Sequence, residues 1–193
     1  MPYPEKLKKS LKKHNVDIKT ISKIFEDFEG LRDKSPKREK VLFFTQAIKQ
    51  IDEKFEYSKK CSILDWCACC KGGKREKEIK RLAKEVQGKN LQDKVKALWS
   101  VENMGKPILN DDNTISTGIF YRDDKGYKCA CSCLHNEEIN EPISSTYCLC
   151  CAGHFRHHYQ KALGIKLKTK KIESSPLESL GKEPCVIIFD IVE

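Results

Sequence analysis

Cysteine is concentrated in three short stretches of the chain, and each stretch holds three of the 11 cysteines. The stretches are Trp66-Cys-Ala-Cys-Cys70, Tyr127-Lys-Cys-Ala-Cys-Ser-Cys-Leu134 and Tyr147-Cys-Leu-Cys-Cys151. A cysteine thiolate is both a metal ligand and a nucleophile. The three stretches therefore indicate either a metal centre or a thiol-dependent enzyme.

The first and third stretches share one form, in which an aromatic residue is followed by Cys, any residue, Cys, Cys, any residue and Gly. This form covers 66–72 and 147–153, and each copy contains a Cys-x-x-Cys pair before an expected helix. Two such pairs supply the four sulfurs of a tetrahedral zinc site, with Zn–S distances of about 2.3 Å. The predicted ligands are Cys67, Cys70, Cys148 and Cys151. An iron–sulfur cluster fits no standard cysteine run, so zinc is the favoured metal.

The middle stretch places Cys129, Cys131 and Cys133 at every second position. On an expected strand over 127–134 these side chains share one face, and the Cα atoms of neighbours lie about 6.6–6.8 Å apart. That separation is at the long end for a disulfide, whereas two thiolates can converge on one metal. A buried face explains the pattern equally well, because free cysteine is among the most buried residues. Cys129 and Cys131 are therefore predicted as substitute metal ligands, together with His154.

An enzyme is the first alternative to a metal centre. The helix dipole stabilises a thiolate at the start of a helix, and Cys70 and Cys151 are both expected at such starts. His154 follows Cys151 by one helical turn, which puts both residues on one face. Cys151 or Cys70 would then attack a carbonyl, with His154 as the base of a thiol-dependent hydrolase. For His154, His157 and His158, a solvated or otherwise satisfied imidazole is the more common interpretation.

The composition limits the remaining classes. A chain of this length buries roughly 70% of its unfolded surface and needs no disulfides to fold. The first residues contain no apolar signal-peptide region and no apolar run reaches bilayer-spanning length, so we expect a cytoplasmic protein without a membrane partner. The net charge of +9 suits an anionic small molecule or nucleic acid. Because the lysines alternate with Glu and Asp and no recognition motif accompanies them, a nucleic-acid-binding regulator is only the second alternative.

Hydrophobic periodicity predicts helices in the first half of the chain and a mixed second half. The expected helices cover 1–15, 17–31 and 41–55, then one after Gly72-Gly73 and one from Asn90. The expected strands cover 114–121, 127–134, 165–172 and 185–192, and a helix over 151–163 is expected to end at Gly164. This order predicts an α+β fold, with N-terminal helices packed against a small antiparallel sheet. We expect a helical segment, 1–60, and a cysteine-rich small-molecule- and metal-binding domain, 61–193, in one compact unit.

The tail of the chain carries a family resemblance. It consists of residues 148–164, Cys-Leu-Cys-Cys-Ala-Gly-His-Phe-Arg-His-His-Tyr-Gln-Lys-Ala-Leu-Gly, a following strand, and the later turn Gly181-Lys-Glu-Pro-Cys185. These residues resemble an uncharacterised, cysteine-rich family of small prokaryotic proteins, and the resemblance covers 61–193. That family is similar in turn to the 2-amino-thiazoline-4-carboxylate hydrolase-like and 4-vinyl reductase-like domains, although this wider similarity covers only the tail.

The resemblance implies an α+β domain whose 4-vinyl reductase-like C-terminal half encloses a small-molecule pocket. Some members of the wider group are sensors, and some of these hold a structural zinc through cysteines near the C-terminus. This chain has Ser-Ser-Pro-Leu at 174–177, where a second thiol is expected before Cys185, so that zinc site is not carried over. The catalytic residues of a hydrolase are not carried over to this chain either. Residues and resemblance together predict a protein that binds metal and a small molecule through clustered cysteines, and they leave its oligomeric state open.

Overall fold

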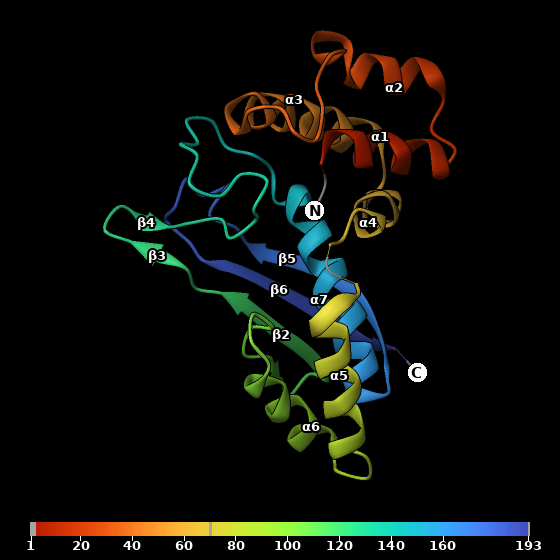
Figure 1. Cartoon of the computed structure of the whole chain (residues 1–193), viewed down its shortest axis with the longest axis vertical. Coiled ribbons are helices and arrows are strands. Elements are labelled where there is room, and N and C mark those ends of the chain that lie inside the picture. Colours follow the sequence, from red (N-terminus) through yellow and green to blue (C-terminus); the bar gives the residue numbers. More distant parts are fainter. Residues whose placement is uncertain (1–2, 70, 193) are drawn as a thin grey trace.

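The N-terminal part of the chain is a group of packed helices (Figure 1). The computed structural model describes residues 3–69 and 71–192. Its first helices are α1 (Pro4–Lys13), α2 (Ile18–Ile24), α3 (Lys37–Lys54) and α4 (Tyr57–Trp66), with a short 3-10 turn at Glu26–Phe28. The Asp17 side chain caps α2 by accepting a 2.8 Å hydrogen bond from the Thr20 amide. Of the apolar stripe predicted here, Phe44, Ala47 and Ile51 on α3 are fully buried.

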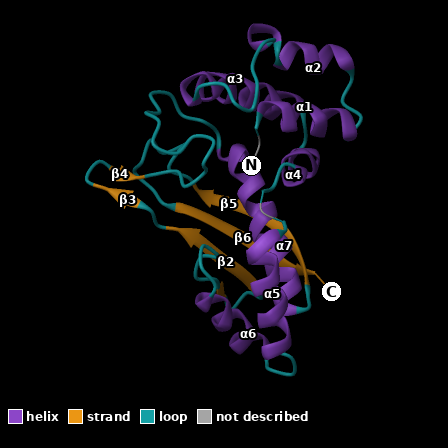
Figure 2. Ribbon diagram, viewed as in Figure 1, coloured by secondary structure: helices purple, strands orange, loops and turns teal. Residues whose placement is uncertain are grey.

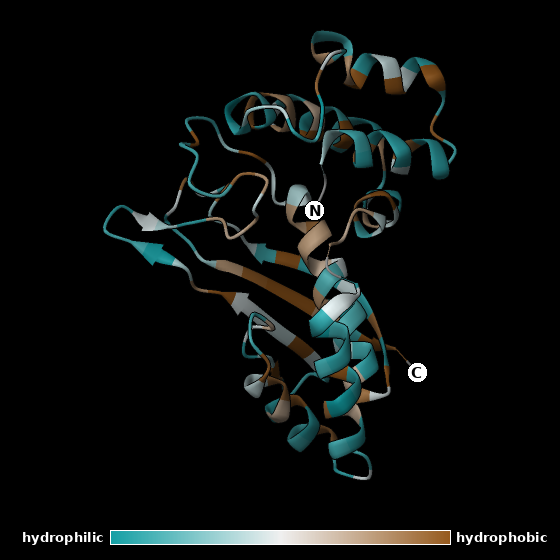
Figure 3. Ribbon diagram, viewed as in Figure 1, coloured by the Kyte–Doolittle hydropathy of each residue, from teal (hydrophilic) through white to brown (hydrophobic). Residues whose placement is uncertain are grey.

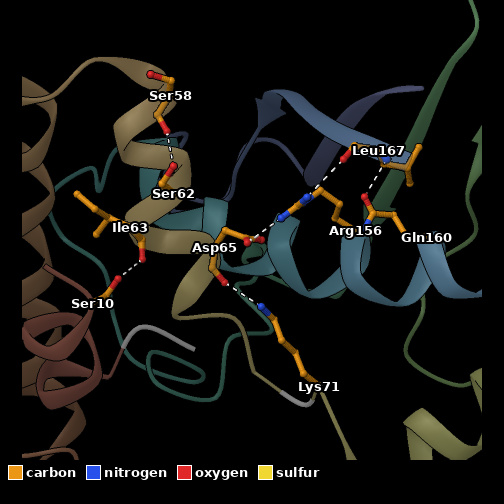
Figure 4. Close-up of polar contacts among 9 residues, drawn as sticks. All are labelled: Ser10, Ser58, Ser62, Ile63, Asp65, Lys71, Arg156, Gln160 and Leu167. Atoms are coloured by element: carbon orange, nitrogen blue, oxygen red, sulfur yellow. Dashed lines mark hydrogen bonds and ion pairs between the residues drawn. The ribbon is translucent and has the colours of Figure 1, made fainter. Parts of the chain in front are cut away.

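Helix α4 differs from the expectation, because the sequence pattern predicts only a connecting segment over 58–66. Its two buried residues are Ile63 and Leu64. An apolar stripe this short gives little periodicity, so the helix is hard to detect from sequence. The Ile63 carbonyl accepts a 2.6 Å hydrogen bond from the buried Ser10 hydroxyl, which ties α4 to α1 (Figure 4).

The second half of the chain forms a four-stranded antiparallel sheet in the order β1-β2-β6-β5, with helices packed on it (Figures 1 and 2). The elements are α5 (Gly73–Glu85), α6 (Leu91–Ala97), β1 (Ile108–Leu109), β2 (Thr114–Ile119), β3 (Arg122–Asp123), β4 (Gly126–Tyr127), α7 (Leu149–Leu163), β5 (Lys166–Ser174) and β6 (Cys185–Val192), with 3-10 turns at Leu98–Ser100 and Ser145–Cys148. Strands β3 and β4 pair as a separate hairpin. Figure 3 shows β6 as mainly hydrophobic and α5 as mainly hydrophilic on the side facing the viewer.

The two edges of the sheet are irregular, whereas its centre is not. Edge strand β1 has only two residues. The other edge strand, β5, shifts its register against β6 at two places. Its exposed residues include Lys166, Lys168, Lys170 and Lys171. Central strand β6 pairs with both β2 and β5 and buries Ile187 and Phe189 in the core.

The predicted α+β fold, with helices and a small antiparallel sheet, is confirmed. The predicted last strand is β6, and the helix predicted over 151–163 is α7. Gly164 ends α7 with a φ of 72°, a left-handed conformation that glycine adopts without strain. None of the helices in the described residues combines the length and apolar character that a membrane span requires.

The strand predicted over 127–134 is wrong beyond Tyr127, where β4 ends. The Cys131 amide donates to the Cys129 sulfur at 3.4 Å, and the Leu134 amide donates to the Cys131 carbonyl at 2.9 Å. These backbone donors are therefore used within the loop instead of pairing with a neighbouring strand. Burial still alternates along this loop, because Cys131 and Cys133 are buried while Ala130 is exposed.

Two hydrophobic cores meet at the start of α7. The first core joins the N-terminal helices to residues far along the chain, including Cys131 and Tyr147. The second core packs α5, α6 and α7 against the sheet. Cys151 contacts both cores. The predicted division into 1–60 and 61–193 falls inside α4, and the first core extends across it.

The end of α4 packs closely against the start of α7 (Figure 4). The Arg156 guanidinium donates to the Asp65 carboxylate at 2.7 Å, and Lys71 donates to the Asp65 carbonyl at 3.2 Å. Glycine is required at position 153, because a Cβ there would lie 2.9 Å from the Cα of Asp65. This contact brings the first cysteine stretch next to the third.

Helix α3 is tied to the segment before α7 through Asp52. Its carboxylate accepts hydrogen bonds from Lys60 at 2.8 Å and from the Thr146 hydroxyl at 2.6 Å. Burial raises the pKa of Asp52, but the hydrogen bonds together lower it by more. The pKa therefore lies below its ordinary value. Thr146 precedes Tyr147, whose buried ring packs on Phe44 with the ring centroids 5.0 Å apart.

We expect Gly153→Ala to lower the free energy of unfolding by about 1–3 kcal/mol, because the added methyl group overlaps the Asp65 backbone. Alanine favours a helix over glycine by about 1 kcal/mol, so helix propensity alone predicts the opposite sign. Urea unfolding of the two proteins measures the difference. Gly30→Ala is the control, since a Cβ at Gly30 meets nothing within 4 Å. A stabilised Gly153→Ala variant would contradict the close contact.

We expect Asp52→Asn to lower the free energy of unfolding at pH 7 by about 1–3 kcal/mol through the loss of two hydrogen bonds to a charged group. Because the folded-state pKa is below the unfolded value of about 3.9, this stabilisation is complete above that value and is lost as the pH falls through the folded pKa. Unfolding curves between pH 7 and pH 2 should therefore converge for the two proteins. Asp27→Asn, at an exposed position, is the control. Parallel curves over the whole range would refute the assignment.

Candidate metal-binding site

Sulfur atoms from separate segments of the chain gather at the start of α7. We call this group the thiol cluster, and its members are Cys69, Cys129, Cys131, Cys148, Cys150, Cys151 and Cys185. The Sγ atoms of Cys150 and Cys151 lie 4.0 Å apart. Cys131, Cys148 and Cys150 are buried in the first core, against which Cys129 and Cys151 pack. The charges of Cys131, Cys148 and Cys69 raise the pKa of Cys151. The structure therefore brings the first and third cysteine stretches together.

Different elements deliver these thiols. The third stretch supplies Cys148, Cys150 and Cys151, from the 3-10 turn and first residues of α7. Cys185 is the first residue of the central strand β6. Cys129 and Cys131 come from the loop that follows β4. The first stretch adds Cys69, whose carbonyl oxygen lies 2.9 Å from Nδ1 of His154 on α7.

Cys129 and Cys131 form a hydrogen-bonded thiol pair. The hydrogen bond with Cys129 lowers the pKa of Cys131 to about 6 against the opposing effect of burial, and Tyr147 lowers it further. The Tyr147 hydroxyl lies 3.2 Å from the Cys131 sulfur. The same pairing, together with burial, raises the pKa of Cys129. The pairing therefore favours the proton on Cys129 and the thiolate form of Cys131.

Cys148 and Cys185 form a second pair between α7 and the sheet. The hydrogen bond with Cys185 lowers the pKa of Cys148 although burial opposes it, and Ser175 contributes in the same direction. The Ser175 hydroxyl lies 3.3 Å from the Cys148 sulfur. The pairing with Cys148, followed by burial, raises the pKa of Cys185. Here too one sulfur of the pair is predisposed to be a thiolate, which is the form that binds metal.

The hydrolase hypothesis requires an activated thiolate at Cys151. The hydrogen bond with Cys150 lowers the pKa of Cys151, but burial and the neighbouring thiols raise it overall. Nδ1 of His154 faces the carbonyl of Cys69 and not a thiol. Both observations favour a structural role over nucleophilic attack. Catalysis by the Cys151–His154 pair stays a prediction.

The other two predicted zinc ligands are Cys67 and Cys70. Cys67 is fully buried in the first core, which also contains Cys131, Cys148 and Cys150, and its sulfur lies 3.5 Å from the Ile63 carbonyl. Burial raises the pKa of Cys67 to about 11, although a hydrogen bond with Ser10 opposes the shift. Cys70, predicted as a ligand and as an alternative nucleophile, lies outside the described residues.

A second group of donors lies where α5 and α7 run side by side. Glu76, His157 and His158 each offer one ligand atom, and these atoms lie within 4.8 Å of one another, so the group can hold a metal ion. Glu76 Oε2 lies 3.4 Å from His157 Nε2 and 3.8 Å from His158 Nδ1. The sequence analysis did not find this group, because its carboxylate is far from its histidines along the chain. The one available signal is that His158 borders the apolar stripe of its helix, and its side chain is fully buried.

The other oxygen of Glu76 is held by lysines. Lys161 pairs with Oε1 of Glu76, and Lys80 lies 3.6 Å from the same atom. The hydrogen bond from Lys161 lowers the pKa of Glu76, while partial burial opposes the shift. Burial, followed by the charge of Lys161, lowers the pKa of His157, so this imidazole is neutral at pH 7 and able to act as a ligand.

Two open grooves run along α3, and none of the described residues that line them is a cysteine. The larger one measures about 730 Å³ and the other about 350 Å³, and both follow α3. The lining of the larger groove includes Asp52, Glu53, Glu141 and Glu178 but no cysteine. An acidic groove does not suit the anionic ligand that the net charge suggests. The small-molecule pocket expected beside the cysteine stretches stays a prediction.

Comparisons with protein-family models, curated proteins and solved structures give no match to this chain. The resemblance of the tail to the 4-vinyl reductase-like domains therefore stays a prediction. What the geometry does provide is a cysteine-rich α+β chain with a Glu/His/His group that can hold a metal ion.

Proposed function

We propose that this protein binds a zinc-type divalent metal in its thiol cluster. The observation that supports the proposal is the shared core at the start of α7, where cysteines of the middle and third stretches pack together and the Cys69 carbonyl meets His154. Thiolate sulfur is a preferred zinc ligand. A metal in this cluster would tie the loop that follows β4 to the start of α7.

The proposed ligands are Cys129, Cys131, Cys148 and Cys151. Cys129 lies close enough to Cys148 and Cys151 for their charges to raise its pKa. The charge of Cys131 likewise affects the pKa values of Cys148 and Cys151. This set keeps the pair predicted in the third stretch. In place of Cys67, whose sulfur faces the Ile63 carbonyl, and its predicted partner in the first stretch, it takes the two substitutes from the middle stretch.

The sulfurs have to draw together to bind the ion. Neighbouring sulfurs in a tetrahedral zinc site lie about 3.8 Å apart. Among the residues that the structure describes, no three cysteine sulfurs lie within 4.8 Å of one another. Cys129 and Cys131 lie in a loop without regular secondary structure, so they can move further than the thiols on α7 or β6. We therefore expect metal binding to order this loop.

Four sulfur ligands complete the coordination of zinc and leave no position for a substrate. The centre would act on stability, because the free energy of metal binding adds to that of folding. We further propose a cytoplasmic location, since a reducing compartment keeps such thiols available for metal. On the resemblance of the tail, we retain a small-molecule ligand as part of the proposal.

We expect protein purified without oxygen to contain about one equivalent of zinc at the thiol cluster. Cys129→Ser and Cys148→Ser should each reduce the zinc content and lower the melting temperature, because three thiolates hold the ion less tightly. Elemental analysis and thermal unfolding, before and after treatment with a chelator, measure both effects. Cys61→Ser is the matched control, since Cys61 is half-buried and lies outside the cluster.

The alternatives give different results. Less than about a tenth of an equivalent of zinc or iron in the folded wild-type protein would refute the proposal. A single thiol that reacts much faster than the others with an alkylating reagent, with no change on addition of chelator, would favour the hydrolase instead. Binding to DNA with a steep salt dependence would favour the nucleic-acid regulator.

A further inference from the structure

Glu76, His157 and His158 are arranged as metal ligands. Two ligands of a tetrahedral zinc ion, bound at about 2.0–2.2 Å, lie about 3.3–3.6 Å apart. The Glu76 carboxylate oxygen lies 3.4 Å from one imidazole nitrogen and 3.8 Å from the other. An ion at the centre of this group requires only a small contraction.

The environment of these atoms also indicates a missing ligand. The side chain of His158 is fully buried, that of Glu76 is 13% exposed and that of His157 is 25% exposed. Within the described part of the chain, Glu76 Oε2 and His157 Nε2 are buried and face each other at 3.4 Å, but neither has a partner with good hydrogen-bond geometry. Buried polar atoms in folded proteins are nearly always paired. A metal ion would satisfy both of these atoms at once.

We propose that Glu76, His157 and His158 form a second metal site, separate from the thiol cluster, for a borderline divalent ion such as zinc, cobalt or nickel. Imidazole nitrogen suits these ions, whereas calcium and magnesium require oxygen ligands. Copper(I) prefers sulfur, which this group lacks. Three protein ligands leave one tetrahedral position for water, as in catalytic zinc sites and unlike the four-sulfur centre.

The lysines on Glu76 are consistent with this role. Lys161 and Lys80 form their ion pairs with Oε1, whereas Oε2 is the oxygen that faces the histidines. Outer partners of this kind fix the ligands of metal sites. Lys161 is 39% exposed, so its ammonium can turn towards water when a cation binds. The competing interpretation is an ion-pair network in which Lys161 simply neutralises Glu76.

Titration of the whole chain with cobalt(II) tests the proposal. We expect one equivalent of cobalt to bind with visible d–d bands but without the near-ultraviolet sulfur-to-cobalt band. This equivalent is in addition to any cobalt that binds through sulfur. Glu76→Gln and His157→Gln should weaken the binding of the cobalt that shows no sulfur band by at least about 10–100-fold. Both variants should leave sulfur-bound cobalt unchanged. Glu78→Gln is the control, because Glu78 lies on the same helix and contacts only Lys74, at 3.9 Å. His157 is partly exposed, so His157→Gln remains informative should Glu76→Gln fail to fold.

Equal cobalt binding without a sulfur band in wild type, Glu76→Gln and His157→Gln would overturn the second site and leave the ion-pair network. A wild-type protein that binds cobalt through nitrogen and oxygen but shows no sulfur-to-cobalt band would refute the thiol centre and support the second site. The two proposals therefore fail independently.

Discussion

The contact of Asp65 with α7 sets the first cysteine stretch and α5 beside α7, the helix at which both candidate centres lie. Arg156 holds the Asp65 carboxylate, and Gly153 allows the two backbones to approach closely. Because Asp65 is at the end of α4, the chain leaves this contact directly into the first cysteine stretch. It then returns as α5 along the same helix, which places Glu76 beside His157. A single junction thus positions a thiol near the start of α7 and a carboxylate about two turns further along it.

The burial of reactive groups at this junction carries an energetic cost. Thiolates and carboxylates lose hydration when they leave water, and only pairing compensates for the loss. In the thiol cluster the compensation comes from neighbouring thiols and from the hydroxyls of Tyr147 and Ser175. At Glu76 it comes from lysines.

Sequence patterning predicted the elements whose signals are local. Strand β6 has a continuous apolar run, α6 has an Asn90 cap, and Gly164 stops α7, so all of these were found. Helix α4 has only a short buried stripe and was missed. The strand predicted over 127–134 was wrong because alternating burial does not require a partner strand. The sequence repeat in the first and third cysteine stretches indicated that both matter, but it could not specify which sulfurs meet.

The Glu/His/His group shows the limit of such patterning most clearly. Its members are joined only by the packing of α5 on α7, which depends on the Asp65 contact and on the second core. No spacing rule connects Glu76 with His157. A buried histidine next to an apolar stripe was the sole local sign, and on its own it does not distinguish a ligand from a packed side chain.

The irregular edge strand β5 has a consequence for how copies of this chain meet. Its hydrogen-bonding register shifts twice, and it presents a row of lysines to solvent. The amides and carbonyls of a β5 strand from a second copy would be out of register with those of the first. Its lysines would also bring further positive charge against the row. The opposite edge, β1, offers only two residues. Growth of the sheet by addition of strands from other molecules is therefore disfavoured, which protects the chain against β-type aggregation.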